Sequence, residues 1–154
     1  MMEETLRLAD YGDVSVVTAL TRAAYAKWVP VIGREPLPMR ADYAEAIRSH
    51  RIDLLTVGDE VAALVETMQR AGDVLIVNVA VAPAFQKRGY GRRMIAHAEG
   101  LATAANLPLV RLYTNSRFDA NLRLYGSLGY EVEREEIFDW GVVIHMLKRV
   151  TVPT

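Results

Sequence analysis

The feature that most constrains the fold of this chain is an apolar segment that passes through a basic, glycine-rich loop directly into an amphipathic helix. Residues 75–81, LIVNVAV, are almost wholly apolar and rich in valine, which is typical of a central strand covered on both faces. Pro83 is expected to end that strand. Beyond the loop, apolar spacing predicts a helix that begins near Gly89 and presents one stripe to the core: Met94, Ile95, Ala98, Leu101, Ala102 and Ala105.

The loop that joins this strand and helix, QKRGYG at residues 86–91, has the properties of an anion site. The first turn of a helix offers unpaired backbone N–H groups and partial positive charge. Gly89 and Gly91 leave the backbone open to a phosphate, and four cations lie nearby: Lys87, Arg88, Arg92 and Arg93. We interpret the loop as a pyrophosphate site, with a tight turn carrying solvated cations as the alternative.

The composition predicts one globular domain over residues 1–154, because 51% of the residues are hydrophobic and 24% are charged. No apolar run is long enough to cross a membrane, and the acidic N-terminal residues do not resemble a secretory signal. We therefore expect a cytoplasmic protein with no membrane partner. A formal net charge of −1 gives no general attraction to nucleic acid, so no nucleic-acid partner is expected.

The chain contains no cysteine, which limits its chemistry. Disulfides, thiolate metal sites and an acyl-cysteine intermediate are all excluded, so an acyl group would have to pass directly from donor to acceptor. No carboxylate–histidine cluster has metal-ligand spacing, and we expect no metal.

Periodicity and turn residues predict an α+β chain with the order β-α-α-β-β-β-α-β-α-β-β. Asp10 or Asp13 is expected to cap the first helix, which ends at residues 28–30. The expected apolar face of that helix is Val16, Leu20, Ala23 and Ala24. Residues 31–40 contain two prolines and are expected to be irregular. The expected strands are residues 5–8, 52–57, 61–67, 75–81, 109–114, 130–138 and 141–150, and the later helices are residues 41–49, from about 89 to 105, and 119–128.

Two motifs in this order resemble the GNAT superfamily of N-acetyltransferases. Residues 86–91 match its Q/R-x-x-G-x-G/A signature, which that family places between a strand and a long helix. A second block, YTNSRFDANLRLYGSLGYE at residues 113–131, is similar to the family's T-N-x-x-x-x-x-N-x-x-L-Y-x-x-x-G-Y/F segment. The resemblance covers residues 52–135 well. It implies the GNAT fold, with a mixed, mostly antiparallel central sheet and helices on both faces.

The resemblance also implies a donor, acetyl-CoA, and the residues that contact it. The pantetheine would lie along the strand, where Val79, Ala80 and Val81 offer backbone N–H and C=O groups. Amides near the helix start would hold the pyrophosphate. The cofactor-binding residues implied in the loop and helix start are Gln86, Lys87, Arg88, Gly89, Tyr90, Gly91 and Arg92.

Three residues of the second motif could reach one ligand. Asn121 and Tyr125 stand four apart and share a helix face, and Asn115 follows the preceding strand. By resemblance, Tyr125 is the general acid that protonates the CoA thiolate, and Asn121 and Asn115 contact CoA. The alternatives are a core aromatic for Tyr125, and a capping or exposed side chain for Asn121.

The general base stays open, because many relatives carry glutamate where this chain has Val77. Glu66 is one candidate, with a solvated strand residue as the alternative. His145 is another, with a sheet histidine as the alternative, and water could carry the proton instead of either side chain. His50 and His97 receive no chemical role. We expect the acceptor pocket to be formed by the variable first part of the chain. The candidate residues are Tyr25, Trp28, Arg34, Met39 and Tyr43. The alternative is that the aromatic residues among them pack in the core or in a dimer contact.

The resemblance therefore implies an acyltransferase that moves an acetyl group from acetyl-CoA to a primary amine of a small molecule or peptide, in a ternary complex. Arg34 would bind a carboxylate if it is not simply solvated. A non-catalytic acyl-CoA-binding or regulatory module of the same fold is the main alternative, and a general nucleotide binder is a third. A homodimer is left open.

Overall fold

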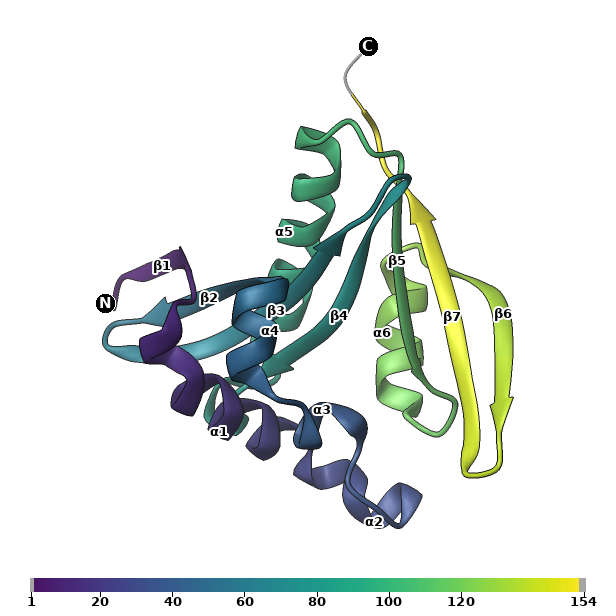
Figure 1. Ribbon diagram of the computed structural model, residues 1–154, viewed down its shortest axis with the longest axis horizontal. Helices are drawn as coiled ribbons and strands as arrows, with labels where there is room; N and C mark the ends of the chain where they lie inside the picture. Colours follow the sequence, from purple (N-terminus) through teal and green to yellow (C-terminus); the bar gives the residue numbers. More distant parts are fainter. Residues whose placement is uncertain (1, 153–154) are drawn as a thin grey trace.

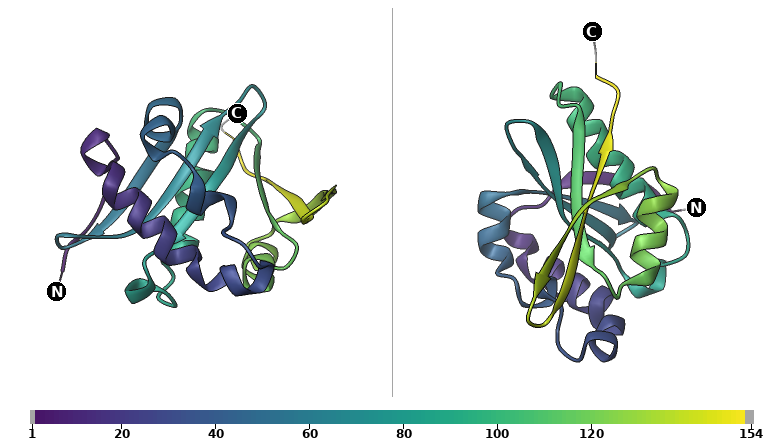
Figure 2. Two further views of the ribbon diagram at one scale, coloured as in Figure 1. Left: turned by 60° about the horizontal axis from the view of Figure 1, so that its bottom comes forward. Right: turned by 90° about the vertical axis from the view of Figure 1, so that its right-hand side faces the viewer.

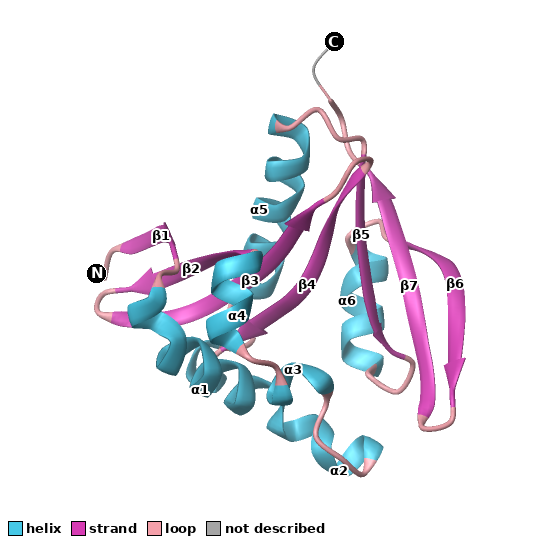
Figure 3. Cartoon of the chain, in the orientation of Figure 1, coloured by secondary structure: helices cyan, strands magenta, loops and turns pink. Residues whose placement is uncertain are grey.

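The computed structural model describes residues 2–152 and contains one seven-stranded sheet with the order β1-β2-β3-β4-β5-β7-β6 (Figures 1 and 3). Every neighbouring pair is antiparallel except β4 and β5, which confirms the predicted mixed, mostly antiparallel sheet. The strands are β1 (Glu4–Leu8), β2 (Arg51–Val57), β3 (Glu60–Gln69), β4 (Asp73–Val81), β5 (Leu109–Asn115), β6 (Glu131–Phe138) and β7 (Gly141–Arg149).

Helices cover both faces of the sheet (Figure 2). One face carries α5 (Tyr90–Ala104) and α6 (Asp119–Ser127), and the other carries α1 (Val14–Tyr25) and α4 (Tyr43–Ser49). Two short helices, α2 (Val29–Ile32) and α3 (Leu37–Arg40), lie between α1 and α4. Single 3-10 turns occupy Tyr11–Asp13, Ala26–Trp28 and Pro83–Phe85. No helix in the described range is long and apolar enough to span a membrane.

The predicted helix after the glycine loop is confirmed, since α5 begins one residue after Gly89 and buries most of the predicted stripe. Two other expectations were wrong in part. In the predicted apolar face of α1, Leu20 and Ala24 are buried, but Val16 and Ala23 are exposed, and Val17 and Thr21 are buried in their place. Residues 31–40 are not wholly irregular, because they include the end of α2 and all of α3. Each of these helices has a proline in its first turn, where the missing N–H costs no helical hydrogen bond.

At a β-bulge in β4, the alternation of side chains between the two faces of the sheet is reversed. Glu66 of β3 pairs with Asn78, but Thr67 pairs with Ile76, so Val77 is an extra residue on β4. Before the bulge, Ile76 packs toward α5; after it, Val79 does. Asn78 therefore faces α1 and α4, and a bulge of this kind also bends its strand.

The bulge coincides with the point where the sheet opens. Strands β4 and β5 pair only from Asp73 to Ile76 and from Leu109 to Leu112, and then diverge, as Figure 1 shows. The edge of β4 from Val77 to Val81 consequently has no strand partner on the β5 side. Unpaired backbone groups on such an edge are available to an extended ligand.

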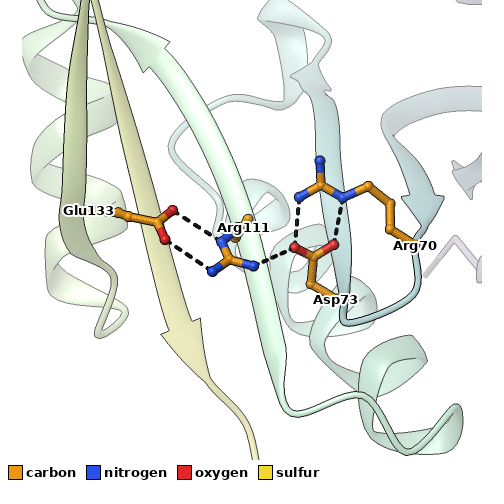
Figure 4. Close-up of polar contacts among 4 residues, drawn as sticks. All are labelled: Arg70, Asp73, Arg111 and Glu133. Atoms are coloured by element: carbon orange, nitrogen blue, oxygen red, sulfur yellow. Dashed lines mark hydrogen bonds and ion pairs between the residues drawn. The ribbon is translucent and has the colours of Figure 1, made fainter.

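An ionic network lies at the end of the sheet where β4 and β5 are still paired (Figure 4). Asp73 accepts hydrogen bonds from Arg70, with both distances 2.6 Å, and from Arg111 Nη1 at 2.7 Å. Arg111 also donates to both oxygens of Glu133 at 3.0 Å, and thereby links β4, β5 and β6. Hydrogen bonds from Arg70 and then Arg111 lower the pKa of Asp73 despite its burial.

Candidate active site

Two cavities lie where β4 and β5 separate. The loop cavity, of about 1100 Å³, is lined by the glycine loop, the start of α5 and the end of α1. The hairpin cavity, of about 670 Å³, is lined by β4, β5, the α2–α3 segment and Trp140 of the β6–β7 turn. Four residues line both cavities, so a ligand in one can meet a ligand in the other at this junction: Tyr25, Val79, Asn121 and Tyr125.

The glycine loop and the start of α5 contain a row of backbone amides without an intramolecular acceptor. Lys87 and Gly89 have left-handed backbone conformations, with φ of 65° and 84°, and Gly89 is the N-cap of α5. Within residues 2–152, the amides of residues 87–89 have no hydrogen-bond acceptor, and the first three amides of α5 have none by helix geometry. All of these residues except Arg88 line the loop cavity. Unpaired N–H groups at a helix N-terminus are typical of an anion site.

The two glycines of the loop have different roles. A side chain at Gly89 would meet open space, so its positive φ is the reason for glycine there. A Cβ at Gly91 would lie 3.8 Å from Val81 Cγ2 and 3.9 Å from Leu124 Cδ2, which is ordinary contact. A methyl group would therefore fit at Gly91 without a clash, and only Gly89 has a conformation that favours glycine.

The cations around the loop do not act alike. Lys87 and Arg92 line the loop cavity. Arg88 instead stacks over Phe85, with 5.5 Å from its Cζ to the ring centroid. Arg93 forms an ion pair with Glu4, whose second carboxylate oxygen accepts a 2.6 Å hydrogen bond from the Tyr90 hydroxyl. The loop charge directed at the cavity therefore comes from two of the four cations.

The β4 edge completes the wall of the loop cavity. Val79, Ala80 and Val81 all line it, next to Gln86. The Gln86 Nε2 group donates a 3.0 Å hydrogen bond to the Val81 carbonyl, so this side chain fastens the loop to the strand. Gln86 is therefore needed for the shape of the loop, whatever it contacts in a ligand.

Tyr125 lies at the junction of the cavities. Its ring packs edge-on against Tyr130, with 6.3 Å between centroids, and its hydroxyl has no hydrogen-bond partner in the described part of the chain. Burial raises the pKa of Tyr125 to about 12. The phenol is thus protonated at neutral pH and free to donate. Tyr125 is therefore packed in the core, with 8% of its surface exposed, and also forms part of the wall of both cavities.

The two asparagines of the second motif lie apart. Asn121 lines both cavities from within the first turn of α6, and Phe118 occupies the N-cap position, so the capping alternative is wrong. Asn115 lines the hairpin cavity, where its Oδ1 accepts a 2.9 Å hydrogen bond from the backbone N of Arg117. Only Asn121 of this pair reaches the wall that faces the glycine loop.

A buried polar group that the sequence pattern did not reveal sits beside the junction. The Tyr25 hydroxyl donates to Asn78 Oδ1 at 2.9 Å and lies 3.4 Å from the Val79 carbonyl. Asn78 Nδ2 donates to the hydroxyls of Thr21 and Tyr43, at 3.4 and 3.3 Å. Burial raises the pKa of Tyr25 well above its usual value. The only available signal was a single asparagine within an apolar strand.

Neither side-chain candidate for the general base lines a cavity at the junction. Glu66 is buried, with 3% of its surface exposed, so the alternative of a solvated strand residue is wrong. Its Oε2 lies 2.6 Å from Nδ1 of His50, for which no chemical role was expected. His145 pairs with Glu136 at 3.0 Å, as a sheet histidine would. Among the described residues that line the loop and hairpin cavities, none is a carboxylate or a histidine.

The candidate acceptor residues divide between site and core. Tyr25 lines both cavities, Trp28 lines the loop cavity while stacking on Phe118 at 4.5 Å, and Arg34 lines the hairpin cavity. Met39 and Tyr43 are buried in the core, as the alternative held. Within the described range, no group of three or more histidine and acidic side chains is placed to hold a metal ion.

Comparison with known proteins agrees with this geometry. The crystal structure of the ribosomal-protein-S18-alanine N-acetyltransferase from Escherichia coli has a TM-score of 0.79 at 18% identity, covering 99% of this chain and 97% of that one. The PaiA N-acetyltransferase from Thermoplasma acidophilum, in complex with coenzyme A, gives 0.79 at 13% identity, covering 94% and 98%. YncA from Salmonella typhimurium, with acetyl-CoA, gives 0.69 at 18% identity, covering 99% and 96%. No curated protein sequence matches the chain.

The chain therefore shares its fold with these solved structures. The sequence profile of the acetyltransferase (GNAT) domain matches residues 51–132, more than half of the chain. The chain belongs to the GNAT acetyltransferase family. Family membership confirms the predicted enzyme class.

Proposed function

We propose that this protein transfers an acetyl group from acetyl-CoA to a primary amine of a small molecule or peptide, directly and within a ternary complex. The observation that carries the proposal is the junction of two cavities at Tyr125, beside an amide-lined loop. Donor and acceptor can occupy separate cavities and meet at one side chain. Such a meeting is what direct transfer requires, since the chain has no cysteine to hold the acyl group.

The residues of the loop cavity fit coenzyme A. The amides of residues 87–92, with Lys87 and Arg92, suit its pyrophosphate, and the edge of β4 from Val79 to Val81, which has no strand partner on the β5 side, suits its pantetheine. Asn121 extends this wall toward the thioester end, and Asn115 lies further along, in the hairpin cavity. Acetyl-CoA supplies the activated acyl group when bound. The protein supplies position and protons.

Tyr125 is the proposed general acid. Its hydroxyl is protonated and has no hydrogen-bond partner within the described chain, so it is available to protonate the departing thiolate. A phenol with a raised pKa holds its proton until a strong base is beside it, and a CoA thiolate is such a base when it is desolvated. Val79 lies across the junction from Tyr125 and contributes backbone groups rather than a side chain that reacts.

Water is the proposed carrier of the proton that the acceptor ammonium loses. The two cavities hold no carboxylate or imidazole among their described lining residues, so neither Glu66 nor His145 touches the amine directly. The same observation favours the second candidate function, a module that binds acyl-CoA without turnover. That module would keep the loop cavity and the amides intact.

Two measurements on the purified chain separate these functions. Calorimetry with acetyl-CoA is expected to give a one-to-one complex. Incubation with a panel of primary amines, with detection of free thiol and of the acetylated product, is expected to show transfer above the rate of spontaneous hydrolysis. Binding without transfer to any amine would support the non-catalytic module, and no binding of acetyl-CoA would contradict both functions.

A further inference from the structure

The hairpin cavity contains a charged group without a partner. Arg34, in the segment between α2 and α3, lines this cavity and stacks on Trp140, with 4.1 Å from its Cζ to the ring centroid. Its Nε is buried and has no hydrogen-bond partner, and no carboxylate pairs with the guanidinium anywhere in residues 2–152. A buried donor left unpaired destabilises the free protein, so a ligand that accepts a hydrogen bond from it gains affinity.

The way in which Arg34 is held defines the geometry of that ligand. Stacking on an indole fixes the guanidinium plane and covers one face, so its N–H groups remain free only at the edges. Trp140 is itself held by Phe138, whose ring is stacked on it at 4.7 Å. An edge of fixed guanidinium N–H groups matches the two oxygens of a planar carboxylate.

The remaining lining of the cavity defines the other parts of the ligand. It is mostly apolar, including Ile32, Leu37, Phe118 and Val143, and its described residues include no acidic side chain. A polycationic amine would therefore meet an arginine and no counter-charge. A compact apolar body fits this lining, and the amine must reach the junction at Tyr125, where the two cavities meet.

We propose that the acceptor is a small primary amine that carries a carboxylate on an apolar body, and that Arg34 binds this carboxylate. This inference rests on the proposed function for the amine end, whereas the carboxylate end stands on the geometry of Arg34 alone. Arg34 and Trp140 come from segments far apart in the sequence, so the specificity of this cavity depends on the first and last parts of the chain together.

The first test compares ligands that differ only in the carboxylate. Phenylalanine with 2-phenylethylamine, leucine with 3-methylbutylamine, and 6-aminohexanoate with hexylamine are matched pairs for acetyl transfer. For binding without chemistry, 3-phenylpropionate and 3-phenylpropan-1-ol are titrated into the CoA complex. We expect at least one carboxylate member to exceed its partner at least tenfold in kcat/KM, and 3-phenylpropionate to bind more tightly than the alcohol.

The second test uses variants of the arginine. Arg34→Gln is expected to raise KM for the carboxylate amine, and Kd for 3-phenylpropionate, at least tenfold, with kcat and CoA affinity nearly unchanged. Arg34→Lys, which keeps the charge but loses the planar fork, should recover part of the binding. Arg40→Gln is the matched control, because Arg40 is exposed on the neighbouring α3 and does not line the cavity.

The outcomes separate this inference from the proposed function. Transfer to amines regardless of a carboxylate, with Arg34→Gln unchanged in KM, would overturn the inference and leave the acetyltransferase intact. Binding of 3-phenylpropionate that depends on Arg34, without transfer to any amine, would support the carboxylate site and remove the enzymatic proposal. If no carboxylate member is bound or acetylated better than its partner, the inference is wrong.

Discussion

At the scale of single residues, Tyr125 combines two properties that usually exclude each other. Its ring belongs to the core around α5 and α6, and its hydroxyl opens to the junction of the cavities. Burial raises its pKa to about 12, so the neutral form persists through the physiological range. The raised pKa keeps the hydroxyl protonated but makes it a weaker acid, so it protonates a thiolate only when the thiolate forms directly beside it and is shielded from water.

The change Tyr125→Phe keeps the ring and removes the proton. We expect kcat to fall about 100-fold or more, the usual range for a lost general acid, with acetyl-CoA affinity nearly unchanged. Steady-state kinetics and calorimetry measure the two quantities. Tyr130→Phe is the matched control, because the Tyr130 hydroxyl bonds Glu99 and lies outside both cavities. A kcat that survives Tyr125→Phe would remove this residue as the acid.

Gly89 offers a second prediction for one residue. Any other residue there adopts its φ of 84° at a cost of about 1–2 kcal/mol, so strain must be separated from charge. Gly89→Gln and Gly89→Glu have the same shape and the same strain. We expect the Glu variant to bind CoA at least about tenfold more weakly than the Gln variant, because its carboxylate repels the pyrophosphate. Equal affinities by calorimetry would show that the anion site is elsewhere.

Much of this residue-scale picture could be predicted from the sequence. Gly89, Gly91 and Tyr125 lie in local motifs whose spacing fixes their environment within a few residues. Asn78 could not be found in this way, because its buried partners are Thr21, Tyr25 and Tyr43, which only the tertiary fold brings to it. The isolation of Glu66 from the cavities has the same cause, since His50 approaches it from another element.

At the scale of elements, the bulge at Val77 has the largest effect on function. It reverses the facing of β4, buries Asn78 under α1, and lies where β4 leaves β5. The apolar run of residues 75–81 predicted the strand correctly, but a single uninterrupted run gives no sign of which residue is the extra one. Likewise the α1 face was predicted only in part: Leu20 and Ala24 are buried as expected, but the buried Thr21, which accepts a hydrogen bond from Asn78, is polar and does not show in an apolar pattern.

Another element-scale prediction concerns the link between β1 and α1. Arg7 donates to both oxygens of Asp13, at 2.8 and 2.9 Å, and this is the main cause that lowers the pKa of Asp13 from 3.8 to about 2. A carboxylate with a lowered pKa stabilises the fold above its unfolded pKa, and this stability is lost as the pH falls toward the folded pKa. The shift corresponds to at most about 2 kcal/mol.

We therefore expect Asp13→Asn to lower the free energy of unfolding by up to about 2 kcal/mol at pH 7, and to have less effect at each step from pH 4 to pH 2. Urea denaturation at a series of pH values measures this. Asp59→Asn serves as the control, since Asp59 lies in the β2–β3 turn and forms no ion pair within the described residues. A difference that is constant across this pH range would show that the charge of Asp13 does not stabilise the fold.

At the scale of the whole molecule, the sheet behaves as two parts joined at one end. The network of Arg70, Asp73, Arg111 and Glu133 holds the closed end (Figure 4), and the cavities occupy the open end. The order of elements was predictable because each has a strong local pattern. The joining of α2–α3 to the β6–β7 turn through Arg34 and Trp140 was not, because contacts between distant segments leave no local periodicity.

We propose that backbone amides of residues 87–92 bind the pyrophosphate of coenzyme A while the thioester lies at the cavity junction. A crystal structure of the protein with bound acetyl-CoA is the decisive experiment. We expect pyrophosphate oxygens about 3 Å from those backbone nitrogens and the thioester sulfur beside the Tyr125 hydroxyl. A well-ordered acetyl-CoA whose pyrophosphate lies away from this loop would contradict it.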